Sequence, residues 1–299
     1  MVQMIQQIIA GLLASAMTLG GSGTVTEVVA PPGSIDPENP PGLTEFIEKV
    51  PDAARIDCTI IQTRTGGEDG LVPDGPDWNE SFGLTAYDAD GRLLGHTTGS
   101  ANVPASAMST TLYAYDAAGN STRSSVYAGD KLISETVHTY DAQGRDVSYT
   151  SYRNSVLDET ADYTYTPQAD GTLLCTRVTH KADGTTSESS YITDQTGNTL
   201  HTENQVGNKT ITVDFTYDEK GRITLVVYDY GAAVPSETHY TYTDAADGSY
   251  TCTVELYDNG VLLSCNKQQY DAWGICTSEE ERNPQGELLR KVTVYTLMP

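Results

Sequence analysis

Apolar and polar residues alternate one by one through most of the chain after residue 80. Ile211, Val213, Phe215 and Tyr217 occupy one set of alternate positions, and threonines and an aspartate fill the positions between them. Successive side chains of a strand point to opposite faces of a sheet, so this period of two predicts strands with one apolar face. Thr, Tyr and Val favour strands, and no helical periodicity follows Gly66. The pattern predicts an all-β chain.

A tyrosine closes these strands at a fixed interval. The spacing is 25 to 28 residues, and the nine positions are Tyr87, Tyr115, Tyr140, Tyr165, Tyr191, Tyr217, Tyr242, Tyr270 and Tyr295. A constant period of this size indicates a supersecondary unit copied many times. In the regular copies Asp follows the tyrosine and Gly stands three positions later. This Asp accepts a backbone hydrogen bond, and the Gly supplies the positive φ of a tight hairpin turn.

A second turn between consecutive tyrosines completes each repeat. It is marked by glycines at 129, 184, 207, 231 and 260. The sequence therefore predicts a long antiparallel β-meander of about sixteen strands, built from two-stranded repeats of about 26 residues. Only 38% of the residues are hydrophobic, too few for a thick two-sided core. Since large sheets twist, we expect a curled or spiralling single sheet.

The segment before the repeats divides into two parts. Residues 1–21 are a candidate signal peptide, because the uncharged run from Ile8 to Leu19 has the length of a signal-peptide core and is too short to span a bilayer. The alternative is a frayed apolar helix of an intracellular protein. Residues 22–80 form a Pro/Gly-rich linker with a short helix at 43–50 and a strand at 58–63. Residues 81–299 form the β-repeat domain.

The charge balance limits the partners. The formal net charge is −24, with 17 Lys and Arg against 41 Asp and Glu. Nucleic acids and anionic membrane surfaces both need clustered basic residues, so neither is expected as a partner. The acidity keeps a long sheet soluble and self-repelling.

The sequence assigns no catalytic, cofactor-binding or metal-binding residue. The five cysteines lack CxxC spacing, and the histidines lie on different repeats. Asp88 and Asp90 resemble the start of a calcium loop, but Gly99 stands where its bidentate Glu is needed. Cys252 and Cys265 lie near each other across a predicted hairpin, as a disulfide or as two buried free thiols.

Aromatic residues two positions before some of the repeating tyrosines form the candidate ligand-binding set. Its members are Tyr113, Tyr163, Phe215 and Tyr240. They share a face with the repeating tyrosines. One interpretation makes this aromatic ladder the core of the curled sheet. The other makes it an open platform on which sugar rings stack.

The motif Tyr-x-Tyr-Asp-x-x-Gly, seen at 113–119, resembles the YD repeat of Rhs proteins, teneurins and toxin-complex shells; the copy at 215–222 has Phe in the first position and ends in Gly-Arg. The resemblance covers about residues 80–299 and implies a spiralling β-sheet that encloses cargo or displays a surface. It also implies carbohydrate binding.

We expect a secreted or surface-attached bacterial protein with a non-enzymatic structural or adhesive role. The alternative is a carbohydrate-binding module that uses the aromatic face. The expected partners are a glycan or another cell-surface polymer, or a protein, and no cofactor is expected. In the repeat unit Gly221 is expected at positive φ, and Arg222 is expected to be solvated.

Overall fold

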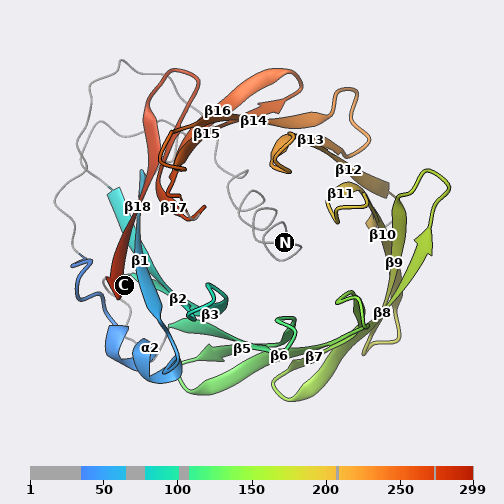
Figure 1. The fold of residues 1–299 in the computed structure, drawn as a ribbon, viewed down its shortest axis with the longest axis horizontal. Helices are drawn as coiled ribbons and strands as arrows, with labels where there is room; N and C mark the ends of the chain where they lie inside the picture. Colours follow the sequence, from blue (N-terminus) through green and yellow to red (C-terminus); the bar gives the residue numbers. More distant parts are fainter. Residues whose placement is uncertain (1–34, 65–77, 101–107, 207–208, 273, 299) are drawn as a thin grey trace.

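The computed structural model describes residues 35–64, 78–100, 108–206, 209–272 and 274–298. A short helix precedes eighteen strands, which follow one another around a single sheet (Figure 1). The elements are α2 (Leu43–Lys49), β1 (Arg55–Arg64), β2 (Trp78–Tyr87), β3 (Leu93–Ser100), β4 (Ser109–Tyr115), β5 (Ser121–Ala128), β6 (Lys131–Tyr140), β7 (Asp146–Arg153), β8 (Val156–Pro167), β9 (Leu173–Lys181), β10 (Thr186–Thr193), β11 (Thr199–Val206), β12 (Lys209–Tyr217), β13 (Ile223–Asp229), β14 (Ser236–Asp244), β15 (Tyr250–Asp258), β16 (Val261–Tyr270), β17 (Cys276–Arg282) and β18 (Leu288–Met298).

The sheet is closed into a barrel. Every strand pairs antiparallel with its neighbours in the chain, and β1 pairs with both β2 and β18. Ile60, for example, lies opposite Phe82 on one side and opposite Thr293 on the other. The predicted all-β antiparallel meander is confirmed, whereas the prediction of an open, curled or spiralling sheet is wrong. Alternation with a period of two is the same in open and closed sheets, so it does not reveal closure.

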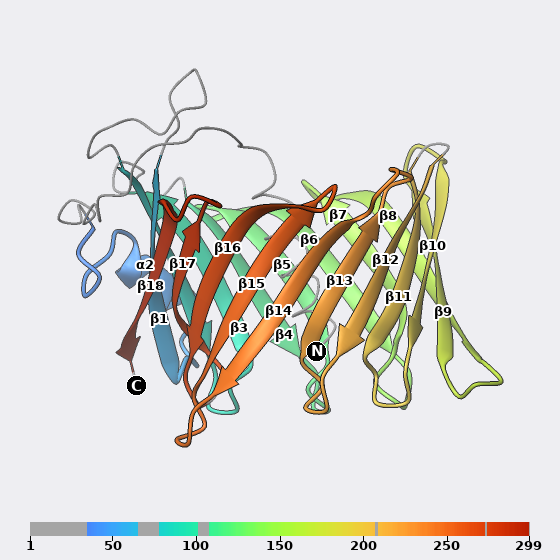
Figure 2. The same ribbon diagram turned by 90° about the horizontal axis from the view of Figure 1, so that it is seen from above.

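The hairpin motif forms as expected. Eight of the nine repeating tyrosines are within two residues of the end of a strand that runs to the lower rim in Figure 2, among them Tyr87, Tyr115 and Tyr217. In the turn after Tyr217, the amide of Gly221 donates to the carbonyl of Asp218 over 3.0 Å, and Gly221 has a φ of +75°. The second-turn glycines at 129, 184, 231 and 260 also have positive φ, and Gly207 lies outside the described residues.

The helix α2 fixes which face of the wall is outside. It lies outside the ring in both views (Figures 1 and 2). Its buried Phe46 belongs to one apolar cluster with Ile56 and Ile60 of β1 and with Phe82 and Leu84 of β2. These strand residues therefore face outward. Paired residues share a face and adjacent residues alternate between the two faces. The register therefore shows, from strand to strand around the ring, which side chains face inward and which face outward.

Candidate functional site

The hairpin turns build a contact that links one repeat to the next. The carboxylate of Asp88 accepts hydrogen bonds from the backbone amides of Asp90 and Arg92 and pairs with the Arg92 guanidinium at 2.6 Å. The same guanidinium lies over the ring of Tyr115, the tyrosine of the following repeat, at 5.4 Å from its centroid. The Tyr115 hydroxyl in turn donates to the carbonyl of Leu93 over 2.8 Å. Each turn that carries an arginine after its glycine thus orients it onto the aromatic ring of the following repeat.

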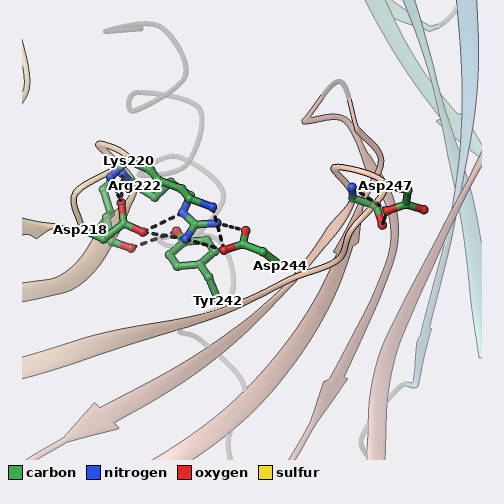
Figure 3. Close-up of polar contacts among 8 residues, drawn as sticks. Asp218, Lys220, Arg222, Tyr242, Asp244 and Asp247 are labelled. Carbon is green, nitrogen blue, oxygen red and sulfur yellow. Dashed lines mark hydrogen bonds and ion pairs between the residues drawn. The ribbon is translucent and has the colours of Figure 1, made fainter.

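Arg222 makes the most extensive contact of this type (Figure 3). Its guanidinium pairs with Asp218 in its own turn at 2.8 Å and with Asp244 in the next repeat at 2.7 Å. It also lies 4.1 Å from the ring centroid of Tyr242, and Lys220 pairs with Asp244 at 2.8 Å. The prediction that Arg222 is solvated is therefore wrong. The second carboxylate that pairs with Arg222 belongs to Asp244, 22 positions later in the chain. The motif around Arg222 contains no information about a partner so distant in the sequence.

The turn carboxylates are held in their charged form. Partial burial opposes ionisation of Asp218, but hydrogen bonds from the Arg222 backbone and side chain leave its pKa below the ordinary value. In Asp141, backbone and side-chain hydrogen bonds from Arg145 lower the pKa. The carboxylate oxygens of these aspartates therefore accept their hydrogen bonds from groups of the same turn.

The inner wall carries most of the aromatic side chains of the described strands, together with part of the aliphatic ones. On β12 and β13, Val213, Phe215 and Val226 are buried and pack with Tyr228 and Tyr240. Their register makes them face inward, opposite to the outward Asp214 and Thr216. Further inward residues are Tyr113, Tyr149, Tyr163, Tyr191, Val254 and Leu256.

Away from α2 the outer wall carries many polar and charged side chains, with apolar ones such as Val137, Val178 and Val227 between them. The side chains of Asp214 and Arg123 are 60% and 56% exposed. Charged residues at outward positions across the ring are Arg123, Glu135, Asp162, Glu188, Glu203, Asp214, Glu237, Glu255, Lys267, Glu280 and Lys291. The apolar outward residues of β1 and β2 are covered by α2. The charged positions interrupt the apolar band, about 25 Å tall, that a lipid-facing wall needs.

The structure places the four predicted ligand-binding residues on this inner wall but does not gather them in one site. Tyr113 lies on β4 beside His96, and Tyr163 lies on β8 beside Tyr149. Phe215 and Tyr240, from β12 and β14, belong to one cluster. The repeat spacing distributes aromatic positions around the ring, and only neighbouring strands bring two of them together.

Three polar atoms on the inner wall next to this cluster are buried without a hydrogen-bond partner among the described residues. They are the hydroxyls of Thr238 and Tyr240 and the side-chain carbonyl of Asn266. Tyr240 and Asn266 both lie opposite Val254 of β15, so the three atoms come from β14 and β16, the two strands that flank β15. The burial of Tyr240 raises the pKa of its hydroxyl, which stays protonated. Buried polar groups are usually paired, so three unpaired atoms in one part of the wall are unusual. The sequence contains no signal for them.

The cysteine pair does not form a bridge. Cys252 is buried on the inner wall opposite Gln268, whereas Cys265 faces outward opposite Glu255, and both thiols are free. A bulge at Leu256 and Tyr257 shifts the register of this hairpin and places the two cysteines on opposite faces. The disulfide alternative is therefore wrong.

The described part of the chain contains no group of three or more His, Cys, Asp or Glu arranged to hold a metal ion. Its helical residues form no segment long and apolar enough to cross a bilayer.

Comparison with known proteins identifies no family. No family model matches the chain, and no curated protein matches it. Among solved structures it is similar to a porin-like protein from Bacteroides uniformis ATCC 8492, with 12% identity and a TM-score of 0.44 over 82% of this chain and 97% of that chain. The assignment to YD-repeat, Rhs-like shells is therefore corrected: no family model supports it, and the sheet closes into an 18-stranded barrel instead of a spiral.

Proposed function

We propose that the chain is a non-enzymatic structural module, secreted or attached to a bacterial surface, that works as a closed barrel surrounded by water. The carrying observation is the distribution of side chains between the two faces. Charged residues such as Asp214 and Glu255 stand outward at mid-strand, and Phe215 and Val226 stand inward. Ionised side chains on a lipid-facing wall would cost about 2–4 kcal/mol each for Lys or Arg at the bilayer midplane, somewhat less for Asp and Glu.

Closure fits a structural role. A long open sheet exposes two edges that pair with other chains, and pairing of β1 with β18 removes both. The regular turns use their carboxylates to cap the hairpins and orient arginines, which supports a non-enzymatic assignment. The export expectation rests on residues 1–21, which lie outside the described residues.

The test is the partition of the full chain between water and lipid. We expect the protein to purify without detergent and to remain at the bottom of a flotation gradient with phosphatidylcholine vesicles. Replacement of Asp214 by Leu, which adds an apolar outward side chain, should not increase flotation. Co-flotation of the native protein, or ion conductance across a planar bilayer, would replace this proposal with a membrane barrel.

A second function, glycan binding by the inner wall, is favoured by the unpaired atoms of Thr238, Tyr240 and Asn266 beside an aromatic ring. Sugar rings stack on aromatic faces and offer hydroxyls to such atoms. Titration of the full chain with an oligosaccharide panel should give binding that weakens in Asn266→Leu and persists in the outward control Lys267→Leu. Equal affinities of the two variants would argue against it.

A further inference from the structure

A groove at the turn-bearing rim lies at a repeat whose turn has Asn120 in place of an arginine, as the turn at 194–198 has Asn198. It has a volume of about 510 Å³ and lies between the turn at 116–120 and the turn at 141–144. Its lining includes Asp116, Asn120, His138, Tyr140 and Gln143. This volume lies within the range of ligand pockets, roughly 300–1,000 Å³.

The regular repeats show what normally fills this position. In three turns an arginine five positions after the tyrosine pairs with the turn aspartate and covers the next repeat's tyrosine. Arg92 lies 5.4 Å from the centroid of Tyr115, Arg145 lies 4.6 Å from that of Tyr165, and Arg222 lies 4.1 Å from that of Tyr242.

Asn120 replaces this arginine in the groove. Its short amide reaches Asp116 over 2.9 Å, but among the described residues no Lys or Arg pairs with Asp116 or lies over the ring of Tyr140. Tyr140 is nevertheless held in the usual orientation, because its hydroxyl donates to the carbonyl of Ser121 over 2.7 Å. The carboxylate and the aromatic face are therefore in place without their cation.

The other charged groups around the groove are already paired. Asp141 pairs with Arg145 at 2.6 Å, and the Nδ1 atom of His138 lies 3.0 Å from Asp146. The side-chain hydrogen bond from Asn120 keeps the pKa of Asp116 low, so its carboxylate is ionised. One carboxylate without a paired cation thus stands beside a tyrosine ring that stacks on His138 at 6.3 Å between centroids and has no arginine over it.

We propose that this groove binds the guanidinium of an arginine side chain from an extended polypeptide partner. The guanidinium would take the position that Arg92, Arg145 and Arg222 occupy in their own repeats, between a turn carboxylate and a tyrosine ring. A planar guanidinium suits both contacts better than a compact ammonium does. The groove is much larger than one guanidinium and so accommodates the residues on either side of the arginine. This site lies at the rim, away from the cluster of Phe215 and Tyr240, and does not depend on the function proposed above.

The test measures binding of an acetylated and amidated Gly-Arg-Gly peptide to the full chain, read from the NMR amide shifts of Tyr140 and Gly144. We expect a dissociation constant on the order of 1 mM, tighter than that of the Gly-Lys-Gly analogue. Methylguanidinium alone should bind more weakly than the arginine peptide.

Asn120→Arg supplies the missing guanidinium from the chain itself and should weaken peptide binding at this groove about tenfold or more. Asn198→Arg is the matched control, because Asn198 caps Asp194 in another turn in the same way and the change in charge is identical. Affinity at the groove should be unchanged in this control. Failure of the native chain to bind, equal loss in both variants, no loss in Asn120→Arg, or equal affinity for the lysine peptide would overturn the proposal.

Discussion

Removal of the Arg222 guanidinium tests whether contacts between repeats stabilise the barrel. In Arg222→Ala the chain loses two ion pairs, with Asp218 and Asp244, and the contact with the ring of Tyr242. Partly exposed ion pairs contribute about 0.2–1 kcal/mol each, and an exposed cation–π contact contributes about 0.5–1 kcal/mol. We expect a loss of about 1–3 kcal/mol in the free energy of unfolding.

Two further variants make the measurement specific. Arg92→Ala should cost less, about 1 kcal/mol or below, because Arg92 pairs only within its own turn and its side chain is 39% exposed, against 21% for Arg222. Arg222→Lys keeps the charge but lacks the planar fork that reaches both carboxylates, so it should recover only part of the loss.

The assay is urea unfolding followed by circular dichroism, with the slope of the transition compared among the variants. An unchanged slope shows that the native and unfolded states expose the same surface and that the midpoint reports stability. Equal midpoints for Arg222→Ala and Arg92→Ala, or a native midpoint in Arg222→Ala, would refute the idea that Arg222 links the repeats.

Three other outcomes are expected. Gly221→Val should lower stability by about 1–3 kcal/mol because Gly221 has a φ of +75°, and Gly221→Asn should lower it less, as thermal unfolding will show. Phe215→Ala should cost about 3–5 kcal/mol, whereas Thr216→Ala on the outer wall should stay within about 0.5 kcal/mol; equal effects would show that the inner wall is not a core. The turn aspartates, such as Asp141, have lowered pKa values in the folded state, so their stabilisation is complete above the unfolded pKa of about 3.9 and is lost as the pH falls through the lower folded values. The urea midpoint should therefore fall between about pH 5 and pH 3, and less steeply in Asp141→Asn.

Local features of the fold were readable from the sequence because they depend on neighbouring residues. The alternation at Ile211 to Tyr217 and the Asp-x-x-Gly turns require only a period of two and a glycine at positive φ. The helix at 43–49 was predicted from its apolar spacing, and the strand predicted at 58–63 lies within β1.

Contacts between distant segments were not readable. Closure depends on β1, which pairs with β18 more than 220 positions later in the chain, as in Ile60 opposite Thr293. The fate of Cys252 and Cys265 depended on one bulge, because a shift of one residue moves a side chain to the other face. The candidate site was not predicted for the same reason. The unpaired atoms of Tyr240 and Asn266 lie at the same level of the wall only because of the register of β14 to β16.

The repeat contacts also explain how one copy can lack its arginine without disrupting the barrel. Tyr115 and Tyr242 are each held twice, by a hydroxyl hydrogen bond to a backbone carbonyl of the preceding strand and by an arginine over the ring. Tyr140 keeps the first contact, at 2.7 Å to Ser121, and lacks only the second. Its strand is also paired along its length with β5 and β7. The missing arginine therefore costs about one cation–π contact and one exposed ion pair, about 1–2 kcal/mol. A closed ring tolerates such a loss because no edge is exposed by it, and the position left open keeps the geometry that a ligand's guanidinium requires.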